Sequence, residues 1–221
     1  PLLQSSAASD VYKRQCLGWT MNERIIFSIE DNIAEVELNR ADKHNALDHE
    51  MFEAILKIGD QISQDNTIRA VILHGAGDSF CAGIDLSMFA DESLANKFNE
   101  RMKPRDSSLA NYYQSAAYVW REIPVPVIAV LHGAVYGGGL QIALGADIRY
   151  ARDNVKLSIM EIKWGIIPDM AMTTSLPYLM SLDKALEMAM TADILNANDA
   201  FDKNLITAIE KNPLEKARVL A

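Results

Sequence analysis

The order of apolar and polar residues along the chain predicts strands and helices in alternation. Residues 24–40 alternate apolar and polar side chains on both sides of Asp31 and Asn32, a pair that favours a tight turn, so this stretch is expected to form a β-hairpin. Residues 48–63 carry apolar side chains at helical spacing, and Asp48 stands where an N-cap is expected. The apolar positions of this predicted helix are Met51, Ile55, Ile58 and Ile62.

Short apolar runs that end in glycine predict buried strands in the middle of the chain. Residues 70–75 and 125–133 are two such runs, and both are rich in β-branched side chains. Strands that alternate with helices are typical of an α/β fold, in which helices cover parallel strands. The remaining predicted elements are helices over 107–122 and 139–146, strands near 147–150 and 155–159, and mainly helix from Met170 onward.

Composition and charge narrow the classes of function. The 221 residues are 49% hydrophobic, which suffices for one well-buried domain. A net charge of -9 argues against a surface that binds nucleic acid or an anionic membrane, and no apolar run reaches the roughly 20 residues of a membrane helix. Two cysteines, Cys16 and Cys81, offer neither a disulfide framework nor a metal cluster, so a reducing, cytoplasmic location is expected.

The two ends of the chain depart from the regular pattern. Residues 1–20 show neither helical nor strand periodicity, and we expect a non-native or disordered leader there, with Met21 beginning the first ordered pattern. They also lack the basic segment and long apolar segment of a secretory signal. A core domain is expected over 21–195. Residues 196–221 are expected to begin a C-terminal helical region that is truncated, because the chain stops within a helical pattern.

Two glycine-containing loops, residues 74–86 and 132–140, follow the two predicted buried strands. Ligands of α/β folds bind outside the carboxyl ends of strands, so both loops are candidates for one site. Gly133 and Gly138 have the spacing of a P-loop, but Gly139 and Leu140 follow where Lys and Ser or Thr are needed, and the dinucleotide-binding pattern is also incomplete. Taken singly, each glycine cluster favours an ordinary tight turn.

Taken together, the motifs resemble the crotonase superfamily, the enoyl-CoA hydratase/isomerase group. The sequences SFCAGIDLSMF and PVPVIAVLHGAVYGGGLQIALGADIRYA carry most of the resemblance, and NRADKHNALD matches an early segment of that family, with Ala41 in place of the usual proline. The resemblance covers roughly residues 22–210 and implies a crotonase-type core, a spiral of (ββα) repeats, followed by helices. Its segments lie in the family order at 39–48, 79–89, 124–151, 160–180 and 185–206.

The resemblance implies a ligand for the glycine loops. In that family a fatty-acyl thioester of coenzyme A binds with its carbonyl oxygen held by two backbone N–H groups, which fall here on Ile84 and Gly138. A thioester enolate carries its charge on that oxygen, so fixed N–H donors in a dry site lower the barrier by several kcal/mol. Gly138 lacks a Cβ and stands at a predicted helix N-terminus, whose partial positive charge adds to the effect. The substrate-binding residues implied are Lys43, His44, Ala46, Ala82, Gly83, Asp85, Leu86 and Gly137.

The same resemblance points to the groups that move protons. The hydratases of the family use two glutamates, and the matching positions here are Gln141 and Glu161. A glutamine can hold a water but cannot take or give a proton at neutral pH, which argues against two-carboxylate hydration. We therefore expect Glu161 to be the acid–base group and Gln141 to share the catalytic site with it. Without the family match, Glu161 would be interpreted as a solvated loop residue.

A second acid, Asp169, lies eight residues beyond Glu161, where the dienoyl-CoA isomerases of the family carry an Asp. Moving a conjugated pair of double bonds needs a base near C2 and an acid near the far end, and an apolar pocket would raise the pKa of both carboxyls. Those isomerases also carry an acid at the position of Gln141, and this chain does not. The alternative is that Asp169, after Pro168, caps a helix that begins near Met170.

Other reactive side chains favour packing. The four histidines His44, His49, His74 and His132 are scattered without metal-ligand spacing, so no metal site is expected. Cys81 has no identifiable base nearby in the sequence and is expected to be a small packed residue. Lys43 lies in the segment that contacts the adenine side of coenzyme A in the family, where phosphates need positive charge.

These observations predict an acyl-CoA enzyme that passes through a thioester enolate. Double-bond isomerisation is the first choice, enoyl hydration of the kind used in fatty-acid oxidation is the alternative, and a catalytically weak acyl-CoA-binding protein is a third. Coenzyme A belongs to the substrate, so no separate cofactor is expected. We also expect no nucleic-acid or membrane partner, and a homo-trimer or hexamer if the C-terminal helices are completed.

Overall fold

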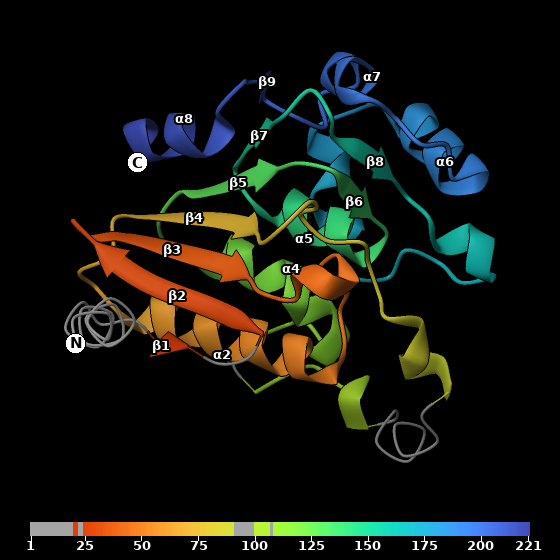
Figure 1. Cartoon of the computed structure of the whole chain (residues 1–221). Coiled ribbons are helices and arrows are strands. Elements are labelled where there is room, and N and C mark those ends of the chain that lie inside the picture. Colours follow the sequence, from red (N-terminus) through yellow and green to blue (C-terminus); the bar gives the residue numbers. More distant parts are fainter. Residues whose placement is uncertain (1–19, 22–23, 91–99, 107) are drawn as a thin grey trace, which may run out of the picture.

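The structure, a computed structural model, describes residues 20–21, 24–90, 100–106 and 108–221 (Figure 1). Apart from Thr20, the predicted leader lies outside these residues, and so does Cys16. The predicted hairpin is confirmed: β2 (Ile25–Glu30) and β3 (Ile33–Leu38) pair antiparallel, and both residues of the turn adopt positive φ, as a two-residue hairpin loop requires. The short strand β1 (Thr20–Met21) pairs antiparallel with β2.

The main sheet has seven strands in the order β1-β2-β3-β4-β5-β7-β9. β4 (Ala70–Gly75), β5 (Val127–Leu131) and β7 (Ile148–Ala151) confirm three predicted strands, and each pairs parallel with its neighbour from β3 onward. β9 (Ala208–Ile209) extends the parallel run and was not predicted, since mainly helix was expected from Met170 onward. Two residues are too few to show an alternation of apolar and polar side chains, which explains the miss.

A second, two-stranded sheet stands beside the first. β6 (Ala134–Tyr136) follows β5 after two residues, β8 (Lys156–Ser158) follows β7 after four, and the two pair parallel. The helix α5 (Gly138–Gly145) starts two residues after β6 and confirms the helix predicted over 139–146. The chain therefore builds strand–strand–helix units, as expected for a crotonase-type core.

Two longer helices begin at side-chain caps. α2 (His49–Gln64) confirms the predicted helix, and the Asp48 carboxylate accepts a hydrogen bond of 2.8 Å from the Met51 N–H. α4 (Tyr112–Glu122) begins five residues later than predicted, because Asn111 and Gln114 close a capping box at its start. The other helices that lie entirely within the described ranges are α6 (Leu182–Thr191), α7 (Ala197–Asp202) and α8 (Pro213–Leu220), with short 3-10 helices η1 (Ala41–Lys43), η2 (Leu86–Ala90), η3 (Glu161–Trp164), η4 (Met172–Thr174) and η5 (Leu176–Tyr178).

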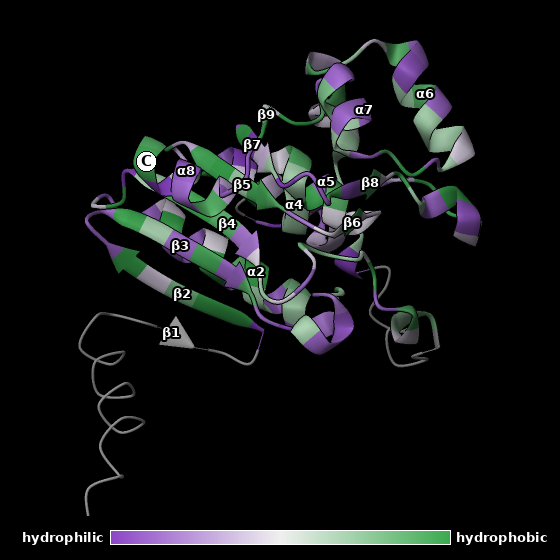
Figure 2. Cartoon of the chain, turned by 45° about the horizontal axis from the view of Figure 1, so that its top comes forward, coloured by the Kyte–Doolittle hydropathy of each residue, from purple (hydrophilic) through white to green (hydrophobic). Residues whose placement is uncertain are grey.

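Apolar layers lie on both faces of the main sheet. The larger one packs α2, α4 and α5 against the sheet and buries Phe27, Phe52 and Trp120 almost completely (Figure 1). Burying a large apolar side chain contributes about 1.5–3 kcal/mol, so this layer dominates stability. Ile72 points to the opposite face, where α8 covers a smaller cluster that also contains Val130. Figure 2 shows hydrophobic residues concentrated along the strands of the main sheet.

Candidate active site

Three parallel segments bring the two glycine loops and Glu161 to one place. β6 and β8 pair with Tyr136 opposite Ser158, so Gly138 and Glu161 follow at the same end of the small sheet. On the other side of β6, Cys81 forms a parallel bridge with Val135, which carries the first glycine loop to the same end. The predicted meeting of the two loops is confirmed.

The pocket at this end contains seven of the residues predicted for the site. They are Ala82, Gly83, Ile84 and Leu86 from the first loop, Gly137 and Gly138 from the second, and Glu161. Its other lining residues were not predicted, and their only signal in the sequence is an apolar side chain within five positions of a predicted site residue. These are Phe89, Met160, Trp164 and Ile166.

The backbone N–H groups of Ile84 and Gly138 have no backbone acceptor within the described ranges. Ile84 and Leu47 form a parallel β-bridge, in which the Leu47 N–H donates to the Gly83 carbonyl and the Asp85 N–H donates to the Leu47 carbonyl. In such a bridge the N–H of Ile84 points away from Leu47. Gly138 is the first residue of α5, where an N–H has no partner within the helix. A Cβ built on Gly83 would lie 3.6 Å from the Gly138 nitrogen, so the two loops are in contact.

Each glycine of the triplet meets a different demand. Gly137 has φ 51 and ψ -121, a backbone conformation open almost only to glycine. A Cβ on Gly139 would overlap the backbone carbonyl of Cys81, so this glycine allows β6 and α5 to pack on the first loop. Gly138 lines the pocket, and a Cβ on it would lie only 2.9 Å from the Met170 sulfur and 3.0 Å from Leu47 Cδ1. The clustering of glycine at a helix entrance is thereby explained.

Glu161 is buried, with 6% of its surface exposed, and the solvated-loop interpretation is wrong. Its Oε1 accepts a hydrogen bond of 2.7 Å from the Gln141 side chain, and its buried Oε2 has no hydrogen-bond partner in the described part of the chain. Burial raises the pKa of Glu161, the negative charge of Asp169 raises it further, and nearby backbone and Gln141 N–H groups lower it in part. A carboxyl with a raised pKa is a stronger base than an ordinary carboxylate, which suits it to take up a proton from a substrate.

Gln141 lies behind Glu161 rather than in the pocket lining. Its side-chain oxygen accepts a hydrogen bond of 3.3 Å from the Met172 backbone N–H, and its nitrogen faces Glu161. The helix α5 therefore places the Gln141 amide next to the buried carboxyl of Glu161. Gln141 is the position at which the resemblance to the hydratases implies a second acid.

Asp169 does not cap a helix, and that alternative is wrong. Helical structure starts only at η4, whose N-cap is Ala171, because Ala171 adopts a left-handed conformation that interrupts the chain after Met170. Asp169 is exposed and does not line the pocket beside Glu161. Partial burial still raises the pKa of Asp169, and its charge acts on Glu161.

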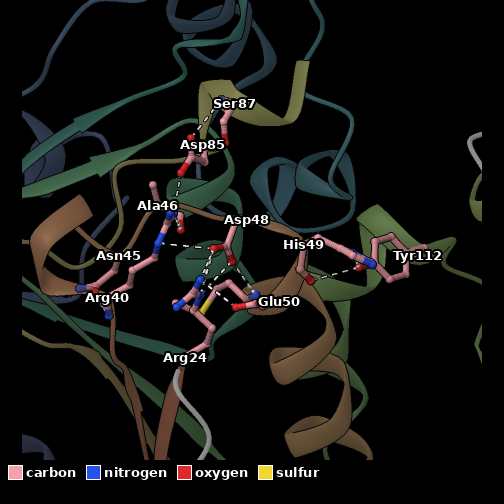
Figure 3. A network of polar contacts seen from close by, with 11 residues as sticks. Arg24, Arg40, Asn45, Ala46, Asp48, His49, Glu50, Asp85, Ser87 and Tyr112 are labelled. Atoms are coloured by element: carbon pink, nitrogen blue, oxygen red, sulfur yellow. Dashed lines mark hydrogen bonds and ion pairs between the residues drawn. The ribbon is translucent and has the colours of Figure 1, made fainter. Parts of the chain in front are cut away.

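The predicted residues from the early segment are connected to the first loop by polar contacts, and Figure 3 shows Ala46 and Asp85 in this network. Lys43 and His44 are exposed, and the His44 ring lies 3.1 Å from the Ser79 hydroxyl. The Ala46 carbonyl and the Asp85 carboxylate both accept from the Arg40 guanidinium, at 3.0 and 2.6 Å. The residues predicted for binding in this group therefore also tie the early segment to the loop of Ile84.

The network in Figure 3 continues from Arg40 into the start of α2. Arg40 lies 3.4 Å from Asp48, which in turn pairs with Arg24 at 2.7 Å. The Ser87 N–H and Arg40 lower the pKa of Asp85 to about 2, so this carboxylate is ionised at neutral pH. Arg40 was not predicted to be part of this link.

Asn45 was also missed, although it braces the site. Its side chain is fully buried, and Nδ2 lies within 3.2 Å of the carbonyls of Ala76, Ser79 and Phe80. Its Oδ1 accepts from the Arg40 N–H at 2.8 Å. An asparagine directly before the apolar pair Ala46 and Leu47 was the available signal, because buried amides need several partners.

Cys81 is fully buried, and burial raises the pKa of its thiol to about 12, which confirms a packed and unreactive cysteine.

Within the described ranges no cluster of His, Cys, Asp and Glu has the arrangement of a metal site, and no helix is long and apolar enough to span a bilayer.

Residues 28–217 match the sequence family described as enoyl-CoA hydratase/isomerase. The chain is 33% identical over 180 residues to a probable enoyl-CoA hydratase of Bacillus subtilis, covering 80% of this chain and 67% of that protein. It is 30% identical over 187 residues to the mitochondrial Delta(3,5)-Delta(2,4)-dienoyl-CoA isomerase of Homo sapiens, covering 83% of this chain and 57% of that protein. The fold is similar to that of a solved enoyl-CoA hydratase/isomerase from Mycobacterium paratuberculosis, with a TM-score of 0.80 at 23% identity, covering 91% of this chain and 78% of that one.

Proposed function

The chain belongs to the enoyl-CoA hydratase/isomerase family, and we propose that it moves double bonds within an enoyl or dienoyl thioester of coenzyme A. One observation carries this choice within the family. The pocket is lined by Ile84 and Gly138, whose N–H groups have no backbone acceptor in the described ranges, and by one buried carboxyl, Glu161, which is hydrogen-bonded to the amide of Gln141. One carboxyl can move a proton between two carbons, whereas the two-carboxylate hydration of the family needs a second acid.

In the proposed reaction the thioester oxygen accepts hydrogen bonds from the N–H groups of Ile84 and Gly138. Glu161 takes a proton from C2: the C–H bond breaks, an O–H bond forms on Glu161, and the electron pair moves into the enolate. The proton then returns to a carbon farther along the chain, and the electron pair moves back to close the new double bond. Fixed donors in a dry site contribute several kcal/mol to such a step.

Asp169 is proposed as a second acid for the longer shift of a dienoyl substrate. Its support is the effect of its charge on Glu161 and a pKa raised by burial. The similarity to a dienoyl-CoA isomerase adds to it. Lys43, exposed at the end of η1, is proposed to meet a phosphate of coenzyme A. Coenzyme A is part of the substrate, and the proposed steps use no other cofactor.

Hydration of a 2-enoyl thioester is the second candidate. The observation that favours it is the 33% identity to a relative named as an enoyl-CoA hydratase. Gln141 would then have to hold the attacking water while Glu161 alone exchanges protons. This arrangement supplies one acid–base group for a reaction that adds both a hydroxyl and a proton.

We also propose self-association as a homo-trimer or hexamer. Large apolar side chains are exposed on η3 and on α6, which contacts it. Contiguous exposed apolar surface marks interaction sites. Sedimentation velocity of the protein tests this directly, because a monomer at micromolar concentration would contradict it. The exposed side chains are Ile162, Trp164, Leu182, Leu186 and Met190.

The proposed function is tested by incubating the purified protein with a 3,5-dienoyl-CoA and a 2-enoyl-CoA in parallel. A gain of 2,4-diene absorbance supports the isomerase. Loss of enoyl absorbance without diene formation would replace it with the hydratase, and saturable binding without turnover would identify an acyl-CoA-binding protein.

A further inference from the structure

Gln141 holds one oxygen of the Glu161 carboxyl and leaves the other free. The Gln141 Nε2 donates to Oε1 at 2.7 Å, whereas Oε2 is buried without a hydrogen-bond partner among the residues that the structure describes. We infer that Gln141 is a positioning residue that confines the exchangeable proton of Glu161 to Oε2. The inference deepens the proposed function, on which its consequence for catalysis rests.

The orientation of the Gln141 amide is fixed from both ends. Its oxygen accepts from the Met172 backbone N–H, and its nitrogen donates to Glu161. A flipped amide would place oxygen against the carboxylate and an N–H against the Met172 N–H, so both contacts would become repulsive. Gln141 is 3% exposed, and water cannot replace either contact at little cost.

A fixed donor decides where the carboxyl carries its proton. If Oε1 were protonated, its O–H would compete with the Gln141 N–H for the same space, so the proton belongs on Oε2. Turning the carboxyl by half a turn would break the 2.7 Å bond. The proton taken from the substrate is therefore held on Oε2 and leaves from the same atom.

The contact also sets the ionisation of Glu161. Burial raises its pKa, Asp169 is the charged group whose field raises it further, and the Gln141 N–H lowers it by stabilising the ionised form. The helix α5, which carries Gln141, has no titratable side chain. Apart from Glu161 itself, the charged groups on η3 and on α6, which packs against it, are exposed: Lys163, Asp183, Lys184 and Glu187. Removing the Gln141 donor is therefore expected to raise the pKa of Glu161.

Titration of Glu161 by carbon-13 NMR tests this without substrate. Protein labelled at the glutamate carboxyl carbons is compared between the natural chain and Gln141→Met, which keeps the size of the side chain but removes the donor. Glu161→Gln identifies the Glu161 resonance by its loss. We expect the pKa of Glu161 to rise by about one unit in Gln141→Met, as the loss of one hydrogen bond to a charged group implies. An unchanged pKa would overturn the inference.

Gln141→Glu keeps the shape of the side chain and provides a second test should the methionine variant fail to fold. Two carboxyls at the distance of the present contact must share a proton, so Glu161 and the new carboxyl should titrate as a coupled pair in two separated steps. Independent titration of the two groups would contradict the contact. Because the titrations are made on the free protein, their failure is distinct from the absence of isomerase activity.

Discussion

The guanidinium of Arg40 donates to Oδ2 of Asp85 at 2.6 Å and so joins the early segment to the loop that carries Ile84. The same side chain donates to the Ala46 carbonyl at 3.0 Å. Asp85 directly follows Ile84, whose N–H is proposed to hold the thioester oxygen. The position of that N–H therefore depends on an ion pair on the far side of the loop.

Replacing Arg40 should lower turnover more than it weakens binding. We expect Arg40→Gln to reduce kcat roughly tenfold or more with a small change in KM, because a small misplacement of a donor costs rate. Arg24→Gln is the matched control, since Arg24 pairs with Asp48 and Glu50 in the same network. Steady-state kinetics on both variants checks this, and equal losses of kcat would count against a specific link from Arg40 to the donor.

The role of the Gly138 N–H can be isolated with two substitutions. Gly138→Pro removes the N–H at the first helical position, where proline is tolerated, and should lower kcat by about 10²–10³. Gly138→Ala keeps the N–H, and the atoms nearest to its Cβ would belong to the side-chain ends of Met170 and Leu47, at 2.9 and 3.0 Å. We expect most activity in the alanine variant. A folded proline variant with normal turnover would show that the Gly138 N–H does not hold the thioester oxygen.

Asp169 should matter for dienes and not for enolate formation. In Asp169→Asn we expect diene isomerisation to stop while the C2 hydrogen still exchanges with heavy water, because Glu161 forms the enolate alone. Diene absorbance and deuterium incorporation by mass spectrometry are measured in parallel. Isomerisation of dienes at the natural rate in this variant would show that Asp169 is not a second acid.

The ion pair between Arg218 on α8 and Glu35 on β3 should stabilise the fold less in acid. Although burial raises it, hydrogen bonds from His74 and Arg218 lower the pKa of Glu35 to about 2, below its ordinary 4.5. A lowered carboxyl pKa stabilises the fold above pH 4.5, and this contribution is lost as the pH falls from 4.5 towards 2. Glu35→Gln should thus lower Tm at pH 6 by a few degrees, about 1 kcal/mol, and by less at pH 3.

Glu37→Gln is the control, because Glu37 lies two residues farther along the same face of β3. Thermal unfolding of the natural chain and both variants at several pH values provides the measurement. A destabilisation by Glu35→Gln that stays constant from pH 6 to pH 3 would contradict the ion-pair account.

Much of the fold could be predicted because its signals are local. The hairpin at Asp31, the cap at Asp48 and the apolar run of β4 each follow from residues next to one another in the sequence. β6 escaped prediction because three residues inside a glycine loop show no periodicity. The helix expected at Met170 does not form there because Ala171 adopts a left-handed conformation. Alanine rarely adopts this conformation, so the sequence does not indicate it.

Only the part of the site that belongs to sequence motifs could be predicted. The two loops and Glu161 follow from the family resemblance, and the structure brings them to one pocket. The hydrogen bond between Gln141 and Glu161 could not be foreseen, because it joins side chains 20 residues apart whose approach depends on the three-dimensional fold. The same holds for Arg40 and Asp85, which are 45 residues apart.

Exchange of the substrate C2 hydrogen with heavy water tests the central claim most directly, because it isolates proton transfer by Glu161 from every later step. The purified protein and Glu161→Gln are each incubated with a 3-enoyl-CoA in heavy water, and deuterium in the acyl chain is followed by mass spectrometry. We expect the natural chain to incorporate deuterium and shift the double bond, and Glu161→Gln to do neither while still binding the thioester. Exchange at the natural rate in Glu161→Gln, or none in the natural chain, would contradict the account.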